Sequence, residues 1–426
     1  MNLLLSKKFN LTTKINYFLI LILPISLLVG SGISNALILL ISFVFLIDLY
    51  QRKNFAFFKD YNFYFLIIIY FYLILNAVLI AKNLDSIVRA IGFLRFIILS
   101  YALFFYLNFF KKKIIKFWFI IFLIVSVDII VEYSFGKNVL GFSSDYQKRI
   151  ASFTGDELKI GHFYFGFIFI SLAYLSNKHQ KLKIFLSLLF FVIALIIGER
   201  SNFIKIFIMY ILFFLFFFEI SYIKKFLVII CLSSLTFFII FKSPQFANNK
   251  LYNNINLAHI FQRIFIQVIQ VKENYVTFKK GENIDKDKII RSNQHFAHYY
   301  TALQIFNENK LFGSGIKTFR IESFNNKYNT IDKFYGQSTH PHQMHFEFLS
   351  ELGIVGYILI ISNLIYILRQ NIIKKKDFLI KAGILYLTAS LIPMLPSGSF
   401  FTSYGAAIFW INYSFLIKKN RLKTTE

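Results

Sequence analysis

The chain has 426 residues, of which 57% are hydrophobic, and its mean hydropathy is +0.60. A soluble domain of this length does not hide so much apolar surface from water, so the composition excludes a soluble protein. The formal net charge is +26. Because the basic residues stand in short clusters between apolar runs, they indicate orientation in a membrane and argue against nucleic acid as a partner.

Apolar runs of suitable length for membrane crossing recur along the chain. A span takes about twenty apolar residues. Twelve runs qualify, at roughly 16–30, 32–48, 63–81, 89–108, 115–134, 161–176, 182–198, 202–220, 225–242, 347–368, 378–395 and 399–417. We therefore expect an all-α, polytopic protein with about 12 transmembrane helices.

Charge in the connections fixes the expected orientation. Alternate connections carry Lys and Arg clusters, beginning with Lys7, Lys8 and Lys14 and ending with Lys418, Lys419 and Arg421. By the positive-inside rule both termini are cytoplasmic. The first run leads at once into a second, so we expect the N-terminus to be retained and not cleaved as a signal peptide. The single cysteine, Cys231, lies in an apolar run, which excludes an internal disulfide.

This topology divides the chain into three parts. Residues 1–242 hold the first nine spans, residues 243–345 form a large loop outside the cytoplasm, and residues 346–426 hold the last three spans and a cytoplasmic tail. A loop of about 100 residues is a functional candidate by size alone. It is expected to contain helices, one of them from about 294 to 309, ending before Gly313-Ser-Gly315.

Three of the eight histidines fall within six residues at the end of this loop, at His340, His342 and His345. A neutral imidazole accepts and passes on a proton near neutral pH, so His342 is the catalytic candidate. An ordinary surface histidine and a zinc site made by all three remain alternatives. Pro341 suits the first turn of a helix that continues into the tenth span. Glu347 and Glu351 are expected to cap or solvate that helix.

Four charged residues elsewhere are candidates for a role. Arg200 is the sole basic residue of a short outer turn, where a guanidinium holds a phosphate bidentately or anchors a helix at the interface. Arg291 and Arg320 flank the expected loop helix and add to an anion site. Arg95 falls inside the fourth span, so it should face a polar cavity or a partner, with Asp128 and Glu157 as possible partners.

The segment from His342 carries a signature. It reads His342-Gln343, then nine residues, Gly353, two residues and Gly356. Three further stretches accompany it: Gly198-Glu-Arg200-Ser, residues 302–315 ending in Leu-Phe-Gly313-Ser-Gly315, and Phe153-Thr-Gly-Asp-Glu157. Together they resemble the O-antigen ligase and polymerase superfamily over nearly the whole chain. Lys310 stands where relatives often carry Pro, a small departure at a helix end.

The resemblance implies a GT-C-like glycosyltransferase of the bacterial inner membrane with a periplasmic active site and no metal or other cofactor. The implied donor is a glycan on undecaprenyl pyrophosphate, and the implied acceptor is a sugar hydroxyl of the lipid A core. Carried over, His342 is the general base or orients the acceptor, and Arg200 and Arg291 bind the pyrophosphate. The supporting residues are Gln343, Gly353, Gly356, His340, Arg95 and Glu157.

Two alternatives stay open at this point. A polymerase that joins repeat units on the same carrier differs only in its acceptor, and the motif residues do not separate it from a ligase. A transporter of a lipid-linked glycan or another anion would use Arg95 and Asp128 as intramembrane charges, but it leaves the large loop and its histidines without a role.

Overall fold

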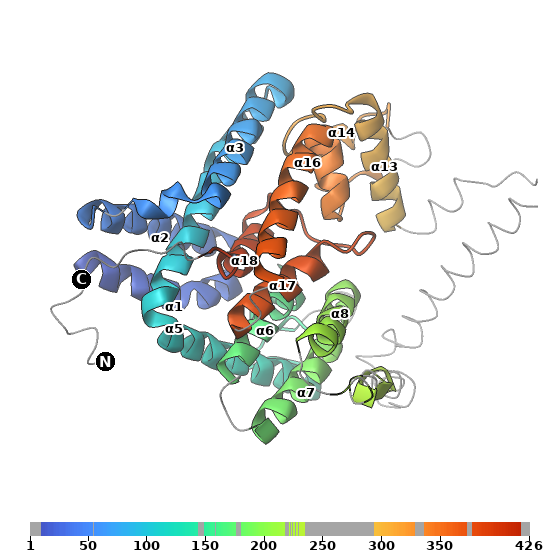
Figure 1. Cartoon of the computed structure of the whole chain (residues 1–426). Helices are drawn as coiled ribbons and strands as arrows, with labels where there is room; N and C mark the ends of the chain where they lie inside the picture. Colours follow the sequence, from blue (N-terminus) through green and yellow to red (C-terminus); the bar gives the residue numbers. More distant parts are fainter. Residues whose placement is uncertain are drawn as a thin grey trace, which may run out of the picture. The chain divides into compact units, whose positions relative to one another are not determined.

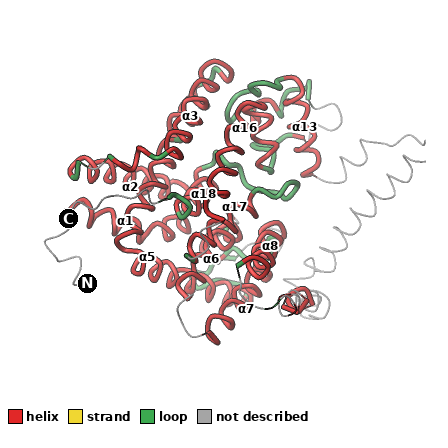
Figure 2. Tube along the Cα trace, in the orientation of Figure 1, coloured by secondary structure: helices red, strands yellow, loops and turns green. Residues whose placement is uncertain are grey.

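The computed structural model describes residues 10–53, 55–143, 149–157, 159–175, 180–217, part of 221–234, 294–328, 336–372 and 377–418. Helices account for all regular structure in these ranges, and no strand occurs in them (Figure 2). The all-α prediction is confirmed. The longer helices are α1 Leu11–Val29, α2 Ser31–Gln51, α3 Tyr61–Asn76, α4 Leu84–Gly92, α5 Leu94–Phe135, α6 Ile160–Leu175, α7 Gln180–Ile196, α8 Arg200–Phe216, α13 Gln294–Glu308, α16 Met344–Ile372, α17 Phe378–Ser390 and α18 Ser403–Ser414.

Short elements join some of these helices. They are two 3₁₀ turns, η1 Ala56–Lys59 and η3 Ser152–Glu157, a π-helical turn, η2 Ala77–Ala81, and a single helical turn, α14 Phe319–Glu322. The chain forms two compact units. The first comprises residues 1–123, 166–184 and 294–426, and the second comprises residues 124–165 and 185–293.

Among the described residues, five helices are long and apolar enough to cross a membrane: Leu11–Val29, Ser31–Gln51, Tyr61–Ala81, Leu84–Phe135 and Met344–Ile372. No loop separates the predicted spans 89–108 and 115–134, but α5 is kinked between them at Phe110, whose φ of −120° and ψ of 15° are not helical. The predicted span 225–242 and the loop residues 243–293 lie largely or wholly outside the described residues. The count of twelve spans therefore stays a prediction.

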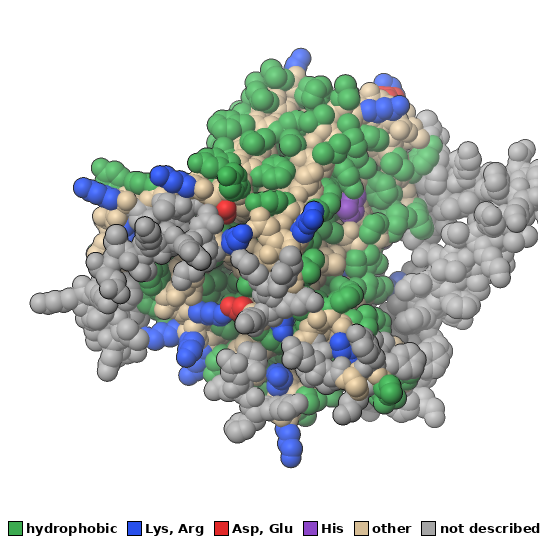
Figure 3. Space-filling view, viewed as in Figure 1, with side chains coloured by type: hydrophobic (Ala, Val, Ile, Leu, Met, Phe, Trp, Pro, Cys, Tyr) green, Lys and Arg blue, Asp and Glu red, His purple; other side chains and the backbone are tan. Residues whose placement is uncertain are grey.

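The surface of α3 fits contact with lipid. Tyr64, Ile68, Phe71 and Leu75 follow one another at helical spacing, and each is 52–58% exposed. Hydrophobic side chains cover much of the visible surface around α3 and α16 (Figure 3). In water such a stripe is unfavourable, but hydrocarbon solvates it. The first unit is therefore built as a membrane protein.

Helix α16 is central to the first unit, because both α3 and α13 pack against it (Figure 1). It is broken at Gly353, whose φ of 66° and ψ of −172° lie outside the helical region. A Cβ at this position would lie 2.4 Å from the carbonyl oxygen of Leu311. Only glycine combines this backbone conformation with so close an approach.

Residues 310–315 supply the hydrogen bonds that α16 loses at its break. The Ser314 and Gly315 N–H groups donate to the carbonyls of Ser350 and Glu351, at 2.9 Å each. In return the Ile354 and Val355 N–H groups donate to the carbonyls of Lys310 and Leu311, at 2.8 and 3.2 Å. Broken helices are tolerated at membrane depth only when other protein groups satisfy the backbone, and this segment does so.

The end of α3 holds the same segment from its other side. The Asn76 side chain donates to the Phe312 carbonyl at 2.7 Å and accepts from the Ile316 N–H at 2.7 Å. Tyr72 donates to the Leu352 carbonyl at 2.5 Å, and its ring would clash with a Cβ on Gly356. Both glycines of the signature are thus needed for packing around the break in α16.

Candidate functional site

The N-terminal end of α16 positions His342. The helix begins at Met344, and the Gln343 side-chain oxygen accepts hydrogen bonds from the backbone N–H groups of His345 and Phe346, at 2.7 and 3.1 Å. Gln343 therefore caps the helix. The prediction that Pro341 lies in the first helical turn is wrong, because it precedes the cap. His342 lies just outside the helix with a left-handed φ of 57°, a conformation uncommon for a residue with a side chain.

Three other imidazole rings surround that of His342. The ring centroid of His340 lies 4.0 Å away, that of His298 5.0 Å and that of His295 5.5 Å. The His342 Nε2 atom is also 3.3 Å from the Ser338 hydroxyl. His295 and His298 come from α13, which packs against α16. We call His295, His298, His340 and His342 the histidine cluster.

The cluster keeps its buried members neutral. Burial is the larger cause, and the neighbouring His340, His298 and His295 the smaller one, of a shift that lowers the pKa of His342 to about 2, because a second positive charge beside them is unfavourable. Burial also lowers the pKa of His298 to about 4, an effect that His295 strengthens and a backbone contact with Gln337 opposes. At neutral pH His342 is therefore an uncharged hydrogen-bond acceptor.

His345 does not join this cluster. Its Nδ1 atom is 3.1 Å from the Tyr357 hydroxyl, and its Nε2 atom is 2.8 Å from the Leu391 carbonyl. The sequence alternative of zinc bound by His340, His342 and His345 thus loses its third ligand. Within the described ranges, no group of three or more His, Cys, Asp or Glu side chains is placed to hold a metal ion.

The structure does not bring the predicted phosphate-binding arginines together in one described site. Arg200 begins α8 in the second unit, is exposed, and follows the buried Glu199, whose pKa is raised by burial. Arg291 lies outside the described residues. Arg320 lies 3.7 Å from Asp85 in the first unit. That Arg200 and Arg291 meet a substrate held at His342 stays a prediction.

Arg95 and Glu157 have local partners. The Arg95 guanidinium donates to the Gly92 carbonyl at 2.6 Å and to the Asn35 side chain at 3.3 Å, and lies over the Phe96 ring. Glu157, in the second unit, pairs with Lys159. The Arg95 partners that we find are thus a carbonyl and an amide, where the sequence suggested Asp128 or Glu157.

Comparison with known proteins supports the family resemblance that the sequence motifs indicate. A family model described as O-antigen ligase matches residues 185–361. The match contains α8 with Arg200, helix α13, and the whole signature from His342 to Gly356. This match supports an assignment to the O-antigen ligase and polymerase superfamily. No curated protein matches the chain.

The family assignment supports a transferase of ligase or polymerase type in a membrane, acting on lipid-linked glycans. Within the family region, the structure gives each signature residue a physical task. His342 places its ring in the histidine cluster, and Gln343 caps α16. Gly353 allows the break in the helix, and Gly356 allows Tyr72 to pack beside it. Two members of the histidine cluster, His295 and His298, were not assigned a role from sequence. Their distance from His342 along the chain concealed the contact.

Proposed function

We propose that this protein is an O-antigen ligase-type glycosyltransferase that moves a glycan from undecaprenyl pyrophosphate to a sugar hydroxyl of the lipid A core. The proposal includes a twelve-span GT-C-like architecture in the bacterial inner membrane, cytoplasmic termini and a periplasmic active site. The observation that carries it is the position of the His342 ring, which lies just outside the end of α16, beside three other imidazole rings and within the family match.

The reaction is a displacement at the anomeric carbon of the donor sugar. The acceptor hydroxyl oxygen forms a bond to that carbon, while the bond from the carbon to the pyrophosphate oxygen breaks. Undecaprenyl pyrophosphate leaves with the bonding electrons, and the hydroxyl proton passes to His342 and from there to a phosphate oxygen or water. Negative charge grows on the leaving group, so guanidinium groups such as those of Arg200 and Arg291 would stabilise the transition state.

The low pKa of His342 bears on this step. An imidazole with a pKa of about 2 accepts a hydrogen bond from the hydroxyl but holds a proton poorly. The arriving pyrophosphate brings negative charge, which favours the imidazolium and raises the pKa. In our proposal His342 therefore orients the acceptor in the free enzyme and becomes an effective base only when the donor is bound.

The test is the surface glycolipid of a deletion strain, resolved on a gel beside the undecaprenyl-linked pool. Loss of all glycan from lipid A, with long polymer on the carrier, establishes a ligase. Lipid A with a single repeat unit establishes a polymerase, which the same family assignment accommodates. An unchanged pattern in both pools overturns both and favours the transporter.

Complementation should use His342→Asn beside wild type. Asparagine tolerates a positive φ, so this change keeps the backbone while removing the imidazole. We expect loss of transfer by about a hundredfold or more, with normal amounts of protein in the membrane fraction. Wild-type glycolipid from this variant would remove His342 from the mechanism.

A further inference from the structure

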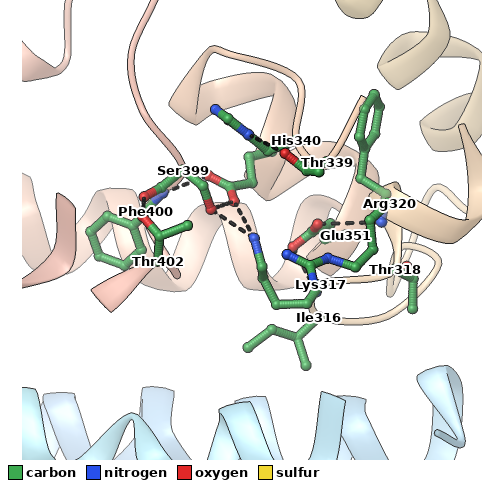
Figure 4. A network of polar contacts seen from close by, with 12 residues as sticks. Ile316, Lys317, Thr318, Arg320, Thr339, His340, Glu351, Ser399, Phe400 and Thr402 are labelled. Carbon is green, nitrogen blue, oxygen red and sulfur yellow. Dashed lines mark hydrogen bonds and ion pairs between the residues drawn. The ribbon is translucent and has the colours of Figure 1, made fainter. Parts of the chain in front are cut away.

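A buried charged network lies one turn below His342. The Glu347 carboxylate accepts from the Phe400 N–H at 2.7 Å and from the Ser399 hydroxyl. The Lys317 ammonium lies 3.6 Å from the same carboxylate and donates to the Ser399 hydroxyl at 2.8 Å (Figure 4). Glu347, Lys317 and Ser399 are each at most 2% exposed. The expectation that Glu347 solvates the helix is therefore wrong.

The network is connected to His342 through the segment before α18. The Ser397 N–H donates to the His342 carbonyl at 2.7 Å. Two residues later Ser399 contacts Glu347, and Phe400 follows. Residues 397–400 thus hold the backbone of His342 at one end, and the Glu347 carboxylate holds them at the other.

Lys317 is itself fixed by contacts that do not involve Glu347. Its backbone has a φ of 60°, and its N–H donates to Glu351 at 2.7 Å. Phe319 donates to the other oxygen of Glu351 at 3.3 Å, and Ser86 donates to the Ile316 carbonyl at 2.6 Å. The ammonium therefore reaches Ser399 and Glu347 from a segment that is already anchored.

Stability is a poor reason for this arrangement. A buried ion pair is often no more stabilising than apolar side chains of the same volume, because desolvation of the charges offsets their attraction. The surroundings are apolar, with the Phe348 and Phe400 rings 5.0 Å apart and Phe401 beside both. The charged groups instead fix the position of residues 397–400, because each of their contacts holds one atom of this segment, which is hydrogen-bonded to His342.

We propose that Lys317, Glu347 and Ser399 are positioning residues that set the orientation of the His342 ring through residues 397–400. The kinetic part of this proposal rests on the proposed function of His342. The structural part does not, because it concerns only where the ring lies. Two kinds of readout therefore test it.

The gentlest variant is Ser399→Ala, which removes the hydroxyl shared by Lys317 and Glu347 and leaves both charges in place. Its matched control is Ser171→Ala in α6, where the hydroxyl is equally buried and has no hydrogen-bond partner in the described part of the chain. We expect Ser399→Ala to lower kcat for glycan transfer about tenfold with an unchanged KM for the donor, because misorientation of a reacting group is costly. The control should keep wild-type kcat.

The second readout is the NMR signal of the His342 imidazole, recorded on the full chain with isotope-labelled histidine in detergent micelles. The signal is assigned by its loss in His342→Asn. We expect Ser399→Ala to shift this signal and its pH titration, and Ser171→Ala to leave both unchanged. Identical His342 signals in the two serine variants would overturn the proposal. If His342→Asn transfers glycan normally, the proposed function fails, but this signal still tests the positioning.

A double variant separates positioning from folding. Lys317→Met leaves Glu347 buried beside no ammonium and should unfold at a lower temperature, whereas Lys317→Met with Glu347→Gln removes both charges. We expect the double variant to regain most of the Tm that Lys317→Met loses, because Glu351 keeps its two backbone N–H donors, but not the wild-type kcat. A double variant with both restored would show that the network serves folding alone, and would overturn the proposal.

Discussion

Two helices in this protein use the same device in different surroundings. On α5, in the second unit, Asp128 and Glu132 stand four residues apart and accept hydrogen bonds from the backbone N–H groups of Val139, Ala151 and Ser152. On α16, in the first unit, Glu347 and Glu351 stand four residues apart and accept from those of Phe400, Lys317 and Phe319. Both pairs are buried, and each ties a distant segment to a helix face.

The differences lie around the α16 pair. It faces the buried ammonium of Lys317, and the helix is broken two residues later at Gly353. Helix α5 continues through its pair, since its only non-helical residue is Phe110. A carboxylate pair is thus sufficient to fasten a segment. The additional charge and the break occur where one of the fastened segments, residues 397–400, also holds the backbone of His342.

The largest effect is expected from Glu347→Ala compared with Asp128→Ala. Removing Glu347 deprives a buried ammonium of its facing carboxylate, which costs about 3–5 kcal/mol of unfolding free energy. Removing Asp128 leaves neutral donors unpaired, at about 1–3 kcal/mol for each. Thermal unfolding in detergent, followed by circular dichroism, measures both. Equal losses would show that the ammonium adds nothing to the α16 pair.

The break in α16 is tested by Gly353→Ala. A side chain in this positive-φ, extended conformation costs about 1–3 kcal/mol, and its contact with the Leu311 carbonyl adds about 1–3 kcal/mol. The control is Gly32→Ala in α2, where a Cβ would meet no atom within 4 Å. That change should leave the Tm unchanged or raise it. A Gly353→Ala protein as stable as wild type would mean that the break is not required.

Acid should increase amide exchange in residues 338–348, around the N-terminal end of α16, at a higher pH than in residues 149–157, which are bound to α5. The pKa values of His342 and His298 in the folded chain, about 2 and about 4, lie below the ordinary value of 6.5, so the folded state binds fewer protons than the unfolded state. The stability that comes from keeping these two rings uncharged is complete above pH 6.5. It is lost as the pH falls to about 4 for His298 and to about 2 for His342. We expect amide exchange in residues 338–348 to accelerate about tenfold at pH 5, after correction for intrinsic rates.

Residues 149–157 provide the comparison within the same sample, and they should change little. His298→Phe keeps the stacked ring but removes one titrating group, so the acid response should weaken in that variant. Uniform acceleration in both segments would assign the acid sensitivity to another part of the chain.

The smallest effect is expected from Gln343→Ala. Loss of a helix cap costs about 1 kcal/mol and is felt locally. Amide exchange should therefore increase at His345 and Phe346, whose N–H groups lose their acceptor, with little change near Gly353. Gln343→Glu should restore protection, because a carboxylate also accepts these bonds and suits a helix N-terminus. Unchanged exchange at both amides would contradict the capping role.

Patterns that are local in the chain were predictable from sequence. Apolar runs predicted most of the described helices, and the spacing from His342 to Gly356 predicted the family that the comparison supports. The predicted spans 89–108 and 115–134 lie on either side of the kink in α5 at Phe110, where the structure has no loop. The Lys111–Lys113 cluster suggests a loop, but these residues are helical, as lysine readily is, and the Lys111 ammonium pairs with Asp377.

Contacts between distant segments were not predictable in this way. Glu351 accepts a hydrogen bond from Lys317, and Glu347 accepts one from Ser399. No local sequence pattern predicts either contact. His298 reaches His342 only because α13 packs against α16. The sequence identified Gly353 and Gly356 as part of a signature. Only the structure shows why glycine is required, because a Cβ would clash with the Leu311 carbonyl at position 353 and with the Tyr72 ring at position 356.

The exchange of backbone hydrogen bonds between residues 310–315 and α16 has a consequence for biosynthesis. Residues 310–315 leave the ribosome before α16, so the partner of the broken turn already exists when the helix enters the bilayer. Without that partner, the carbonyls of Ser350 and Glu351 would lack their hydrogen-bond donors, which is costly wherever water is excluded. Nascent chains with a damaged 310–315 segment should therefore be retained by membrane quality control and degraded, even when every apolar span is intact.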